Sequence, residues 1–128
     1  MTVESIVVTA AVIERNGAFL LARRPTGVHL AGLWEFPGGK CGAAESLEGC
    51  LMREIREELD CDVAVGAEIF ATSHDYPERR VELHFFACLL LQEPRAALGQ
   101  ELRWVPRADL RTLDYPPADH ALIELLSR

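Results

Sequence analysis

Three glutamates crowd one short segment of this acidic chain. Glu54, Glu57 and Glu58 lie in the stretch REIREELD at residues 53–60, and they fall within about one turn if that stretch is a helix. Like charges three and four residues apart on a helix repel, and each such pair costs roughly a few tenths of a kcal/mol. The chain already carries a formal net charge of −7. The cluster therefore indicates either an ordinary solvated face or a site for a cation.

The apolar residues of the same segment limit where the glutamates can point. They recur at helical spacing: Leu47, Leu51, Met52, Ile55 and Leu59. On this helix the three glutamates lie beside the apolar stripe and partly overlap it, whereas a purely solvated face would be centred opposite. Carboxylate oxygens suit hard cations such as Mg²⁺. The helix alone leaves both interpretations open, because pairing with Arg53 or Arg56 would also offset the repulsion.

The residues before this helix supply a longer pattern. The stretch FPGGKCGAAESLEGCLMREIREELDC contains Gly-x5-Glu-x7-Arg-Glu-aliphatic-x-Glu-Glu without gap or insertion. Its defined positions are Gly39, Glu45, Arg53, Glu54, Ile55, Glu57 and Glu58. This pattern resembles the Nudix box, and its many fixed positions make the resemblance highly specific. A cation site becomes the favoured interpretation.

One position departs from the family pattern. The Nudix box has a glycine after Glu-Glu-x, whereas this chain has Asp60. That glycine ends the helix in a left-handed conformation, which aspartate tolerates better than most residues at a cost of about 1 kcal/mol. The departure concerns helix termination and not ligation, so we expect activity to be retained.

The resemblance implies a role for each residue of the box. Mg²⁺, or Mn²⁺ in its place, would be the cofactor, and it would be bound by Gly39 through its carbonyl and by Glu54, Glu57, Glu58 and Glu101. Arg53 would orient Glu54 by a charged hydrogen bond. Glu54 is the expected general base and Glu45 the reserve candidate. A metal that bridges a polyphosphate neutralises developing charge and activates a water.

The similarity extends over most of the chain and is strongest to the MutT branch of the family. That branch hydrolyses nucleoside triphosphates, oxidised guanine nucleotides among them, to the monophosphate and pyrophosphate. Three segments carry it: ARRPTGVHLAGLWEFPGGK, YPERRVELHFF and YPPADHALIELL. It implies a nucleoside pocket lined by Arg24, His29, Phe36, Arg79 and Asp119, with Lys40 near the phosphates. Each of these residues, and Glu101, also has a simpler interpretation as a core aromatic, a structural histidine or a surface charge.

Asp119 carries the most information about the base. MutT has asparagine at the matching place, and an ionised aspartate only accepts hydrogen bonds. The adjacent N1–H and 2-amino donors of a guanine-type base would satisfy it, whereas cytosine N3 would repel it. A protonated Asp119 would reverse this argument, and burial can produce one. On the interpretation that Asp119 is ionised, we favour 8-oxo-dGTP as the substrate. Because LWEF and PAD also resemble cytidine-nucleotide pyrophosphohydrolases, CTP or a modified cytidine nucleotide is the alternative, and a non-catalytic nucleotide-binding Nudix module is a third hypothesis.

Around these residues the sequence predicts an α+β fold in a single domain spanning residues 1–128. Strands are expected at 5–14, 18–24, 63–76, 79–92 and 102–105, with a turn at 15–17 and a tight turn at 37–39. Helices are expected at 47–59, capped by Ser46, and at 117–127, with a helical turn at 107–110. Without regular βαβ alternation, this order suggests a mixed β-sheet sandwiched between helices, as in the Nudix fold.

Composition narrows the possible partners. A pI near 5.0 argues against binding to a nucleic acid polymer, which favours a basic surface. The longest apolar run, FFACLLL at 85–91, is far shorter than the roughly 20 residues of a membrane helix. We expect a cytoplasmic monomer or weak dimer that binds a small nucleoside triphosphate. Its four cysteines, at 41, 50, 61 and 88, form no C-x-x-C motif and are expected to be reduced thiols.

Overall fold

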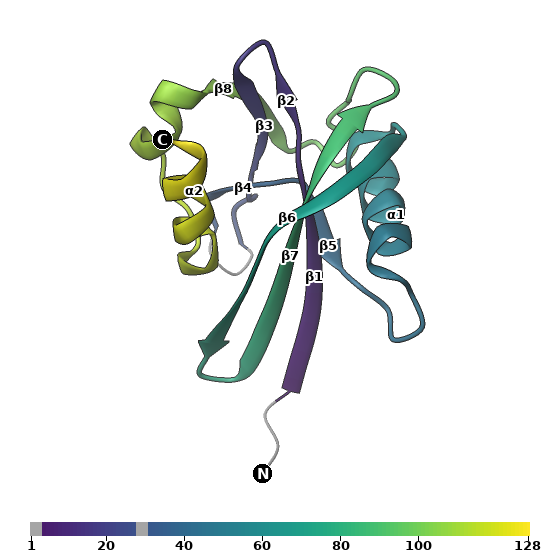
Figure 1. Cartoon of the computed structure of the whole chain (residues 1–128). Coiled ribbons are helices and arrows are strands. Elements are labelled where there is room, and N and C mark those ends of the chain that lie inside the picture. The colour runs from purple at the N-terminus through teal and green to yellow at the C-terminus, as the bar shows by residue number, and fades with distance from the viewer. Residues whose placement is uncertain (1–3, 28–30) are drawn as a thin grey trace.

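The computed structural model describes residues 4–27 and 31–128, and its main sheet runs through the centre of the molecule (Figure 1). This sheet has the order β5-β1-β7-β6. Its strands are β1 (Glu4–Val12), β5 (Gly38–Lys40), β6 (Val63–Tyr76) and β7 (Arg79–Leu90). β1 pairs with β7 in parallel, and the other neighbours are antiparallel. The main sheet is therefore mixed, as the sequence predicts.

A second, smaller sheet forms around β3 (Ala18–Arg23). β3 pairs antiparallel with β2 (Glu14–Arg15), β4 (Trp34–Glu35) and β8 (Glu101–Pro106). The turn between β2 and β3 has positive φ angles at Asn16 (53°) and Gly17 (79°), as a two-residue hairpin turn requires.

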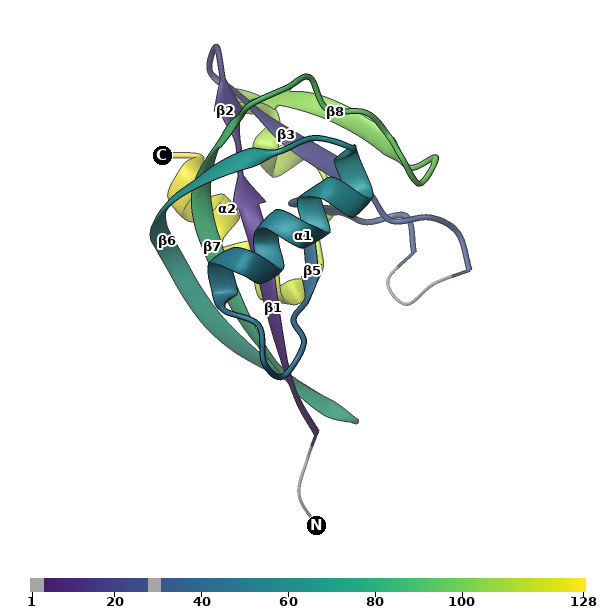
Figure 2. The ribbon, with the colours of Figure 1, turned by 90° about the vertical axis from the view of Figure 1, so that its right-hand side faces the viewer.

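Two helices cover opposite faces of the main sheet, as the two perpendicular views show (Figures 1 and 2). α1 (Leu47–Leu59) lies on one face. On the other face lies α2 (His120–Leu126), which follows a short 3-10 helix, η2 (Pro117–Asp119). A further 3-10 helix, η1 (Arg107–Thr112), precedes them. The predicted α+β fold with a mixed sheet between helices is confirmed.

Both ends of α1 follow the sequence prediction. The Ser46 hydroxyl accepts a hydrogen bond from the Gly49 amide at 3.0 Å, which satisfies one of the unpaired N–H groups at the start of a helix. Asp60 ends the helix with φ 50° and ψ 42°. It adopts the left-handed conformation that the family glycine would provide, so the departure at this position does not alter the course of the chain.

Hydrophobic residues form one core on each face of the main sheet. On the α1 face, Leu51, Ile55 and Leu59 are completely buried and pack with Phe86 of β7. On the α2 face, a second cluster contains Phe36, Phe85 and Leu122. Alternate residues of β7 thus face different cores, and the two cores fix α1 and α2 to the sheet.

Two short segments differ from the sequence prediction. The stretch PGG at 37–39 is predicted to form a tight turn, yet Gly38 and Gly39 belong to β5 and pair with β1. A Cβ atom at Gly38 would lie 2.0 Å from the Thr9 carbonyl oxygen, so only glycine allows this approach. Trp34 and Glu35 form β4, where the sequence predicts no strand. Both pairings are long-range and leave no periodic pattern in the sequence.

The prediction of four reduced cysteines is wrong for one pair. Cys41 and Cys50 form a disulfide with Cα atoms 5.3 Å apart, because the chain after β5 runs close to the first half of α1. Cys61 and Cys88 are free and buried. Within the described residues, no helix is long and apolar enough to cross a membrane.

Candidate active site

The Arg53 guanidinium is the centre of a charged network on α1. Its Nε and Nη2 donate to the two carboxylate oxygens of Glu45 at 2.7 and 2.8 Å. Its Nη1 donates to Glu54 at 3.0 Å and to Glu57 at 3.2 Å, and its Nη2 also reaches the Lys40 carbonyl at 3.1 Å. One arginine therefore ties three carboxylates of the box to the chain at the end of β5.

The pKa values of the two candidate bases, Glu45 and Glu54, are shifted in opposite directions. Hydrogen bonds from Arg53 and from the Gly42 amide lower the pKa of Glu45 to about 2. Burial raises the pKa of Glu54, and its hydrogen bond and attraction to Arg53 only partly offset this. Glu45 is thus a fixed anion with both oxygens engaged, whereas Glu54 has the higher proton affinity that a base needs. The assignment of Glu54 as the general base, with Glu45 as the reserve candidate, stays a prediction.

Glu58 is the most strongly perturbed carboxyl of α1. Burial raises its pKa to about 8, and the charges of Glu35, Glu54 and Glu57 act in the same direction. The Gly38 amide donates a hydrogen bond to Glu58 at 3.3 Å. Among the causes of the pKa shift, this hydrogen bond is the one that lowers the pKa. A buried carboxylate of this kind is costly without a counter-charge. A cation beside it would remove that cost.

The donor set fits a hard divalent cation. The carboxylates of Glu54, Glu57 and Glu58 come from one face of α1, and the Gly39 backbone lies against Glu54. A Cβ atom at Gly39 would lie 2.2 Å from Glu54 Oε2. All these donors are oxygens, the ligands that Mg²⁺ and Mn²⁺ prefer. Within the described chain no three such side chains already converge on one point, since Arg53 engages two of them.

Glu101 lies outside this network. It stands on β8, and its carboxylate pairs with Arg23 at 3.5 Å and with Arg103 at 3.3 Å. About half of its side chain is exposed. The structure gives it the simpler role of a surface ion pair, and its role as a metal ligand stays a prediction.

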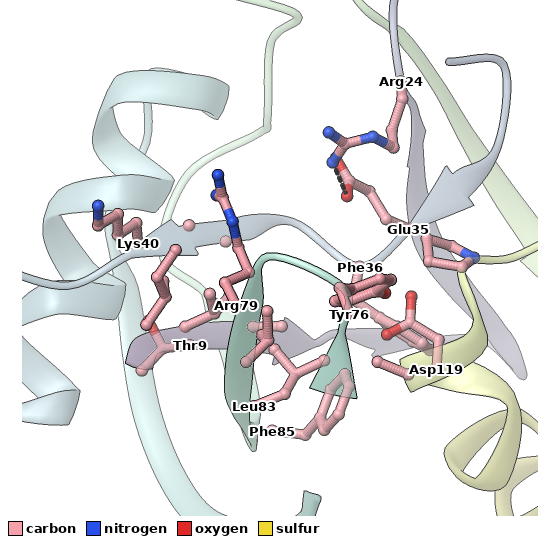
Figure 3. Close-up of a pocket in the computed structure, with 18 of the residues that line it drawn as sticks. Thr9, Arg24, Glu35, Phe36, Lys40, Tyr76, Arg79, Leu83, Phe85 and Asp119 are labelled. Atoms are coloured by element: carbon pink, nitrogen blue, oxygen red, sulfur yellow. Dashed lines mark hydrogen bonds and ion pairs between the residues drawn. The ribbon is translucent and has the colours of Figure 1, made fainter. Parts of the chain in front are cut away.

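A cavity of about 750 Å³ opens next to Glu58 and runs toward α2 (Figure 3). Five of the predicted substrate-binding residues line it: Arg24, Phe36, Lys40, Arg79 and Asp119. The sixth, His29, lies outside the described residues. Residues from β1, β5, β7 and the η2 segment, far apart in the sequence, thus meet around one space large enough for a nucleotide.

Asp119 lies at the α2 end of this cavity and is 5% exposed. Burial, followed by the charge of Glu35, raises its pKa to about 7, although Arg24 opposes the shift. Phe36, 4% exposed, packs edge-on against Phe85 with ring centroids 5.7 Å apart. Phe36 is therefore a core residue whose remaining surface belongs to the cavity.

Among the cavity residues that sequence reasoning missed, Glu35 and Tyr76 have side chains that could bind a ligand. Glu35 accepts a hydrogen bond from Arg24 at 2.8 Å, and burial raises its pKa. Tyr76, at the end of β6, points toward Phe36 and Asp119 (Figure 3). A charged residue inside the apolar stretch LWEF was a signal that could have identified Glu35. Nothing in the sequence around Tyr76 marks it in the same way.

Comparison with known proteins agrees with this geometry. A family model described as the NUDIX domain matches residues 8–125, which include the glutamate helix and every residue that lines the cavity except Ile6. The chain belongs to the Nudix hydrolase family. Members of this family generally use a divalent metal, in agreement with the oxygen donors on α1.

Relatives of this Nudix hydrolase differ in the base they recognise. CTP pyrophosphohydrolase of Escherichia coli (strain K12) is 39% identical over 127 residues, covering 93% of this chain and 89% of its own. The 8-oxo-dGTP diphosphatase of Haemophilus influenzae is 36% identical, covering 96% and 93%. A MutT protein from Methanosarcina mazei Go1 superimposes with a TM-score of 0.88 at 25% identity, covering 100% and 96%. The hydrolase is a nucleotide pyrophosphohydrolase of the MutT type, and its relatives leave the base open.

Proposed function

We propose that this hydrolase converts 8-oxo-dGTP to the monophosphate and pyrophosphate in a Mg²⁺-dependent reaction, and so removes oxidised guanine nucleotides before they enter DNA. One observation carries the proposal. One cavity is lined by Gly39, Lys40 and Glu58 of the box region and also by Phe36 and Asp119. Figure 3 shows Lys40 on one side of this space and Asp119 on the other. A nucleoside triphosphate likewise has two parts. Its polyphosphate would be held near α1 and its base near α2.

The residues around α1 would carry the chemistry. Glu54, Glu57, Glu58 and the Gly39 carbonyl would hold Mg²⁺, which would supply charge neutralisation for the polyphosphate and would acidify a water. Glu54 would accept the proton of the attacking water, and Arg53 would keep its carboxylate oriented. Lys40 and Arg79 also line the cavity and would contact phosphate oxygens.

The residues near α2 would select the base. Phe36 and Tyr76 provide aromatic surface, and Asp119 provides the polar contact. When ionised, Asp119 accepts from the two adjacent donors of a guanine-type base. When protonated, it donates to cytosine N3 and accepts from the 4-amino group. Its pKa of about 7 allows both states near neutral pH, so CTP is a second candidate, favoured also by the 39% identical relative.

Turnover of a substrate panel tests the proposal. The panel holds 8-oxo-dGTP, dGTP, CTP, a modified dCTP and ADP-ribose, each with Mg²⁺ and with products separated by chromatography. We expect the highest kcat/KM for 8-oxo-dGTP, well above dGTP, with release of pyrophosphate. Preference for the cytidine compounds would keep the metal chemistry and overturn the assignment of the base. No turnover of any compound would leave the nucleotide-binding module as the better hypothesis.

The ratio of the two activities is expected to depend on pH. Burial raises the pKa of Asp119 to about 7, so the donor form dominates below pH 7 and the acceptor form above it. Between pH 6 and 8 the kcat/KM ratio of CTP to 8-oxo-dGTP should fall, by up to about a hundredfold for one titrating group. Titration of Glu54 affects both substrates and cancels in the ratio. Asp119→Asn should flatten the profile; an equally steep profile in that variant would assign the effect elsewhere.

The expected cytoplasmic location and the monomeric or weakly dimeric state stay predictions. The Cys41–Cys50 disulfide is uncommon in reducing compartments, so it bears on the location. The acidic composition, with a pI near 5.0, still supports a small nucleotide, and not a nucleic acid polymer, as the partner.

A further inference from the structure

The Cys41–Cys50 disulfide joins two segments of the candidate active site. Cys41 directly follows β5, and Cys50 lies in the first half of α1. Gly39 stands two residues before one cysteine, and Glu54 stands one helical turn after the other. The bond therefore spans the strand–helix contact at which Gly39 touches Glu54. The hydrogen bond from Arg53 to the Lys40 carbonyl, at 3.1 Å, crosses the same contact without a covalent link.

The two sulfur atoms differ in access. Cys50 is completely buried, whereas Cys41 is partly exposed. The hydroxyl of Thr9, itself completely buried, lies 3.3 Å from Cys50 Sγ and 3.8 Å from Cys41 Sγ. Because bonded sulfurs carry no proton, the hydroxyl is the donor. If the bond is broken, a thiolate at Cys50 would accept a hydrogen bond from the Thr9 hydroxyl without any movement of Thr9.

We propose that Cys41–Cys50 is a redox-active disulfide whose state sets the cation affinity of the active site; the proposal rests on the metal site proposed above. The reductant is a dithiol. Its thiolate attacks Cys41 Sγ, the S–S bond breaks, and Cys50 leaves as a thiolate that accepts from Thr9 and is then protonated. The second thiol of the reductant displaces Cys41 and closes the reductant's own disulfide. Two electrons pass to the protein, and both cysteines end as thiols.

Reduction loosens the contact between β5 and α1. β5 has only three residues and lies at the edge of the main sheet, so it has one strand neighbour. Without the disulfide, Gly39 is held against Glu54 by non-covalent contacts alone: the pairing of β5 with β1, the hydrogen bonds of Arg53 to the Lys40 carbonyl and of the Gly38 amide to Glu58, and the packing of α1. A site that is correctly arranged for a smaller fraction of time binds its cation more weakly in proportion to that fraction.

The test compares the metal-free wild-type protein before and after treatment with dithiothreitol, with intact mass recording the two-electron change. Mn²⁺ affinity is measured by electron paramagnetic resonance titration, and Tm without metal is measured in parallel. Reduction is expected to weaken Mn²⁺ binding roughly fivefold. It is expected to lower Tm by roughly 8 °C, as for opening a short disulfide loop in a domain of this size.

Variants separate this bond from the other cysteines. The double variant Cys61→Ser/Cys88→Ser should respond to dithiothreitol as the wild type does. The double variant Cys41→Ser/Cys50→Ser should resemble the reduced wild type and show no response; if it does not fold, the wild-type comparison decides alone. Equal Mn²⁺ affinity in both redox states would overturn this proposal only. Absence of Mn²⁺ binding in both states would overturn the metal site and this proposal with it, and four free thiols in the untreated protein would overturn the bond.

Discussion

Glu54→Gln is expected to lower kcat by about 10³-fold with every accepted substrate. Glutamine preserves the shape of the side chain and can still accept from Arg53, which now donates to Glu54 at 3.0 Å. It neither accepts a proton from water nor contributes negative charge to a cation. The loss therefore reports on both proposed roles of Glu54, and steady-state rates with saturating Mg²⁺ measure it.

The same variant is expected to melt at a higher temperature than the wild type when no divalent metal is present. Burial raises the pKa of Glu54, and the charges of Glu57 and Glu45 act in the same direction, so the ionised carboxylate is unfavourable in the folded protein. Glu48→Gln is the matched control, since Glu48 is an exposed residue in the first turn of the same helix. It should change neither kcat nor Tm appreciably. An unchanged kcat in Glu54→Gln would refute the mechanism.

Gly39→Ala is expected to lower kcat about a hundredfold with little loss of stability. The new Cβ atom would lie 2.2 Å from Oε2 and 2.4 Å from Cδ of Glu54, so the carboxylate must move by more than 1 Å. A displacement of about 1 Å in a catalytic group costs roughly a hundredfold in rate. The clash is with the end of a flexible side chain, so the fold itself can adapt. Rates and thermal melts of the same preparation separate the two effects.

Substitutions at two neighbouring glycines, Gly42 and Gly38, serve as comparisons for Gly39→Ala. At Gly42 an added Cβ atom would stand 3.3 Å from the nearest atom of Glu45, a contact that a small shift relieves. Gly42→Ala should therefore keep most of the activity. At Gly38 the added atom would lie 2.0 Å from the Thr9 carbonyl oxygen, which is backbone, and Gly38→Ala should lower Tm strongly. If Gly39→Ala matched Gly42→Ala in rate, Gly39 would not be placed against the catalytic carboxylate.

The parts of the fold that the sequence predicts well have local causes. The apolar spacing from Leu47 to Leu59, the Ser46 cap and the Asp60 terminus define α1 residue by residue. β6 and β7 are signalled by their long apolar and β-branched runs and by the turn between them. The Arg53–Glu54 contact was likewise expected, from the resemblance to the Nudix box.

The parts that the sequence does not predict depend on long-range contacts. β5 exists because two glycines can approach the backbone of β1. The Cys41–Cys50 bond depends on how that strand then meets α1. The pKa of Asp119 depends on burial and on Glu35, which come from other segments of the chain. Such properties follow from tertiary structure, and a single sequence holds no periodic trace of them.

The parallel pairing of β1 with β7 sets the order in which the molecule can be built. Residues 4–12 pair with residues 79–87, so during synthesis the first strand has to wait until most of the chain has emerged. Contacts between such distant segments form slowly because the long intervening loop must close first. α1 and β5 lie within that loop. Their packing against the main sheet is complete only after β1 has paired with β7. Because α1 packs against Phe86 of β7, the candidate active site is complete only once this pairing has formed, and the apolar first strand stays open to contact with other chains until then.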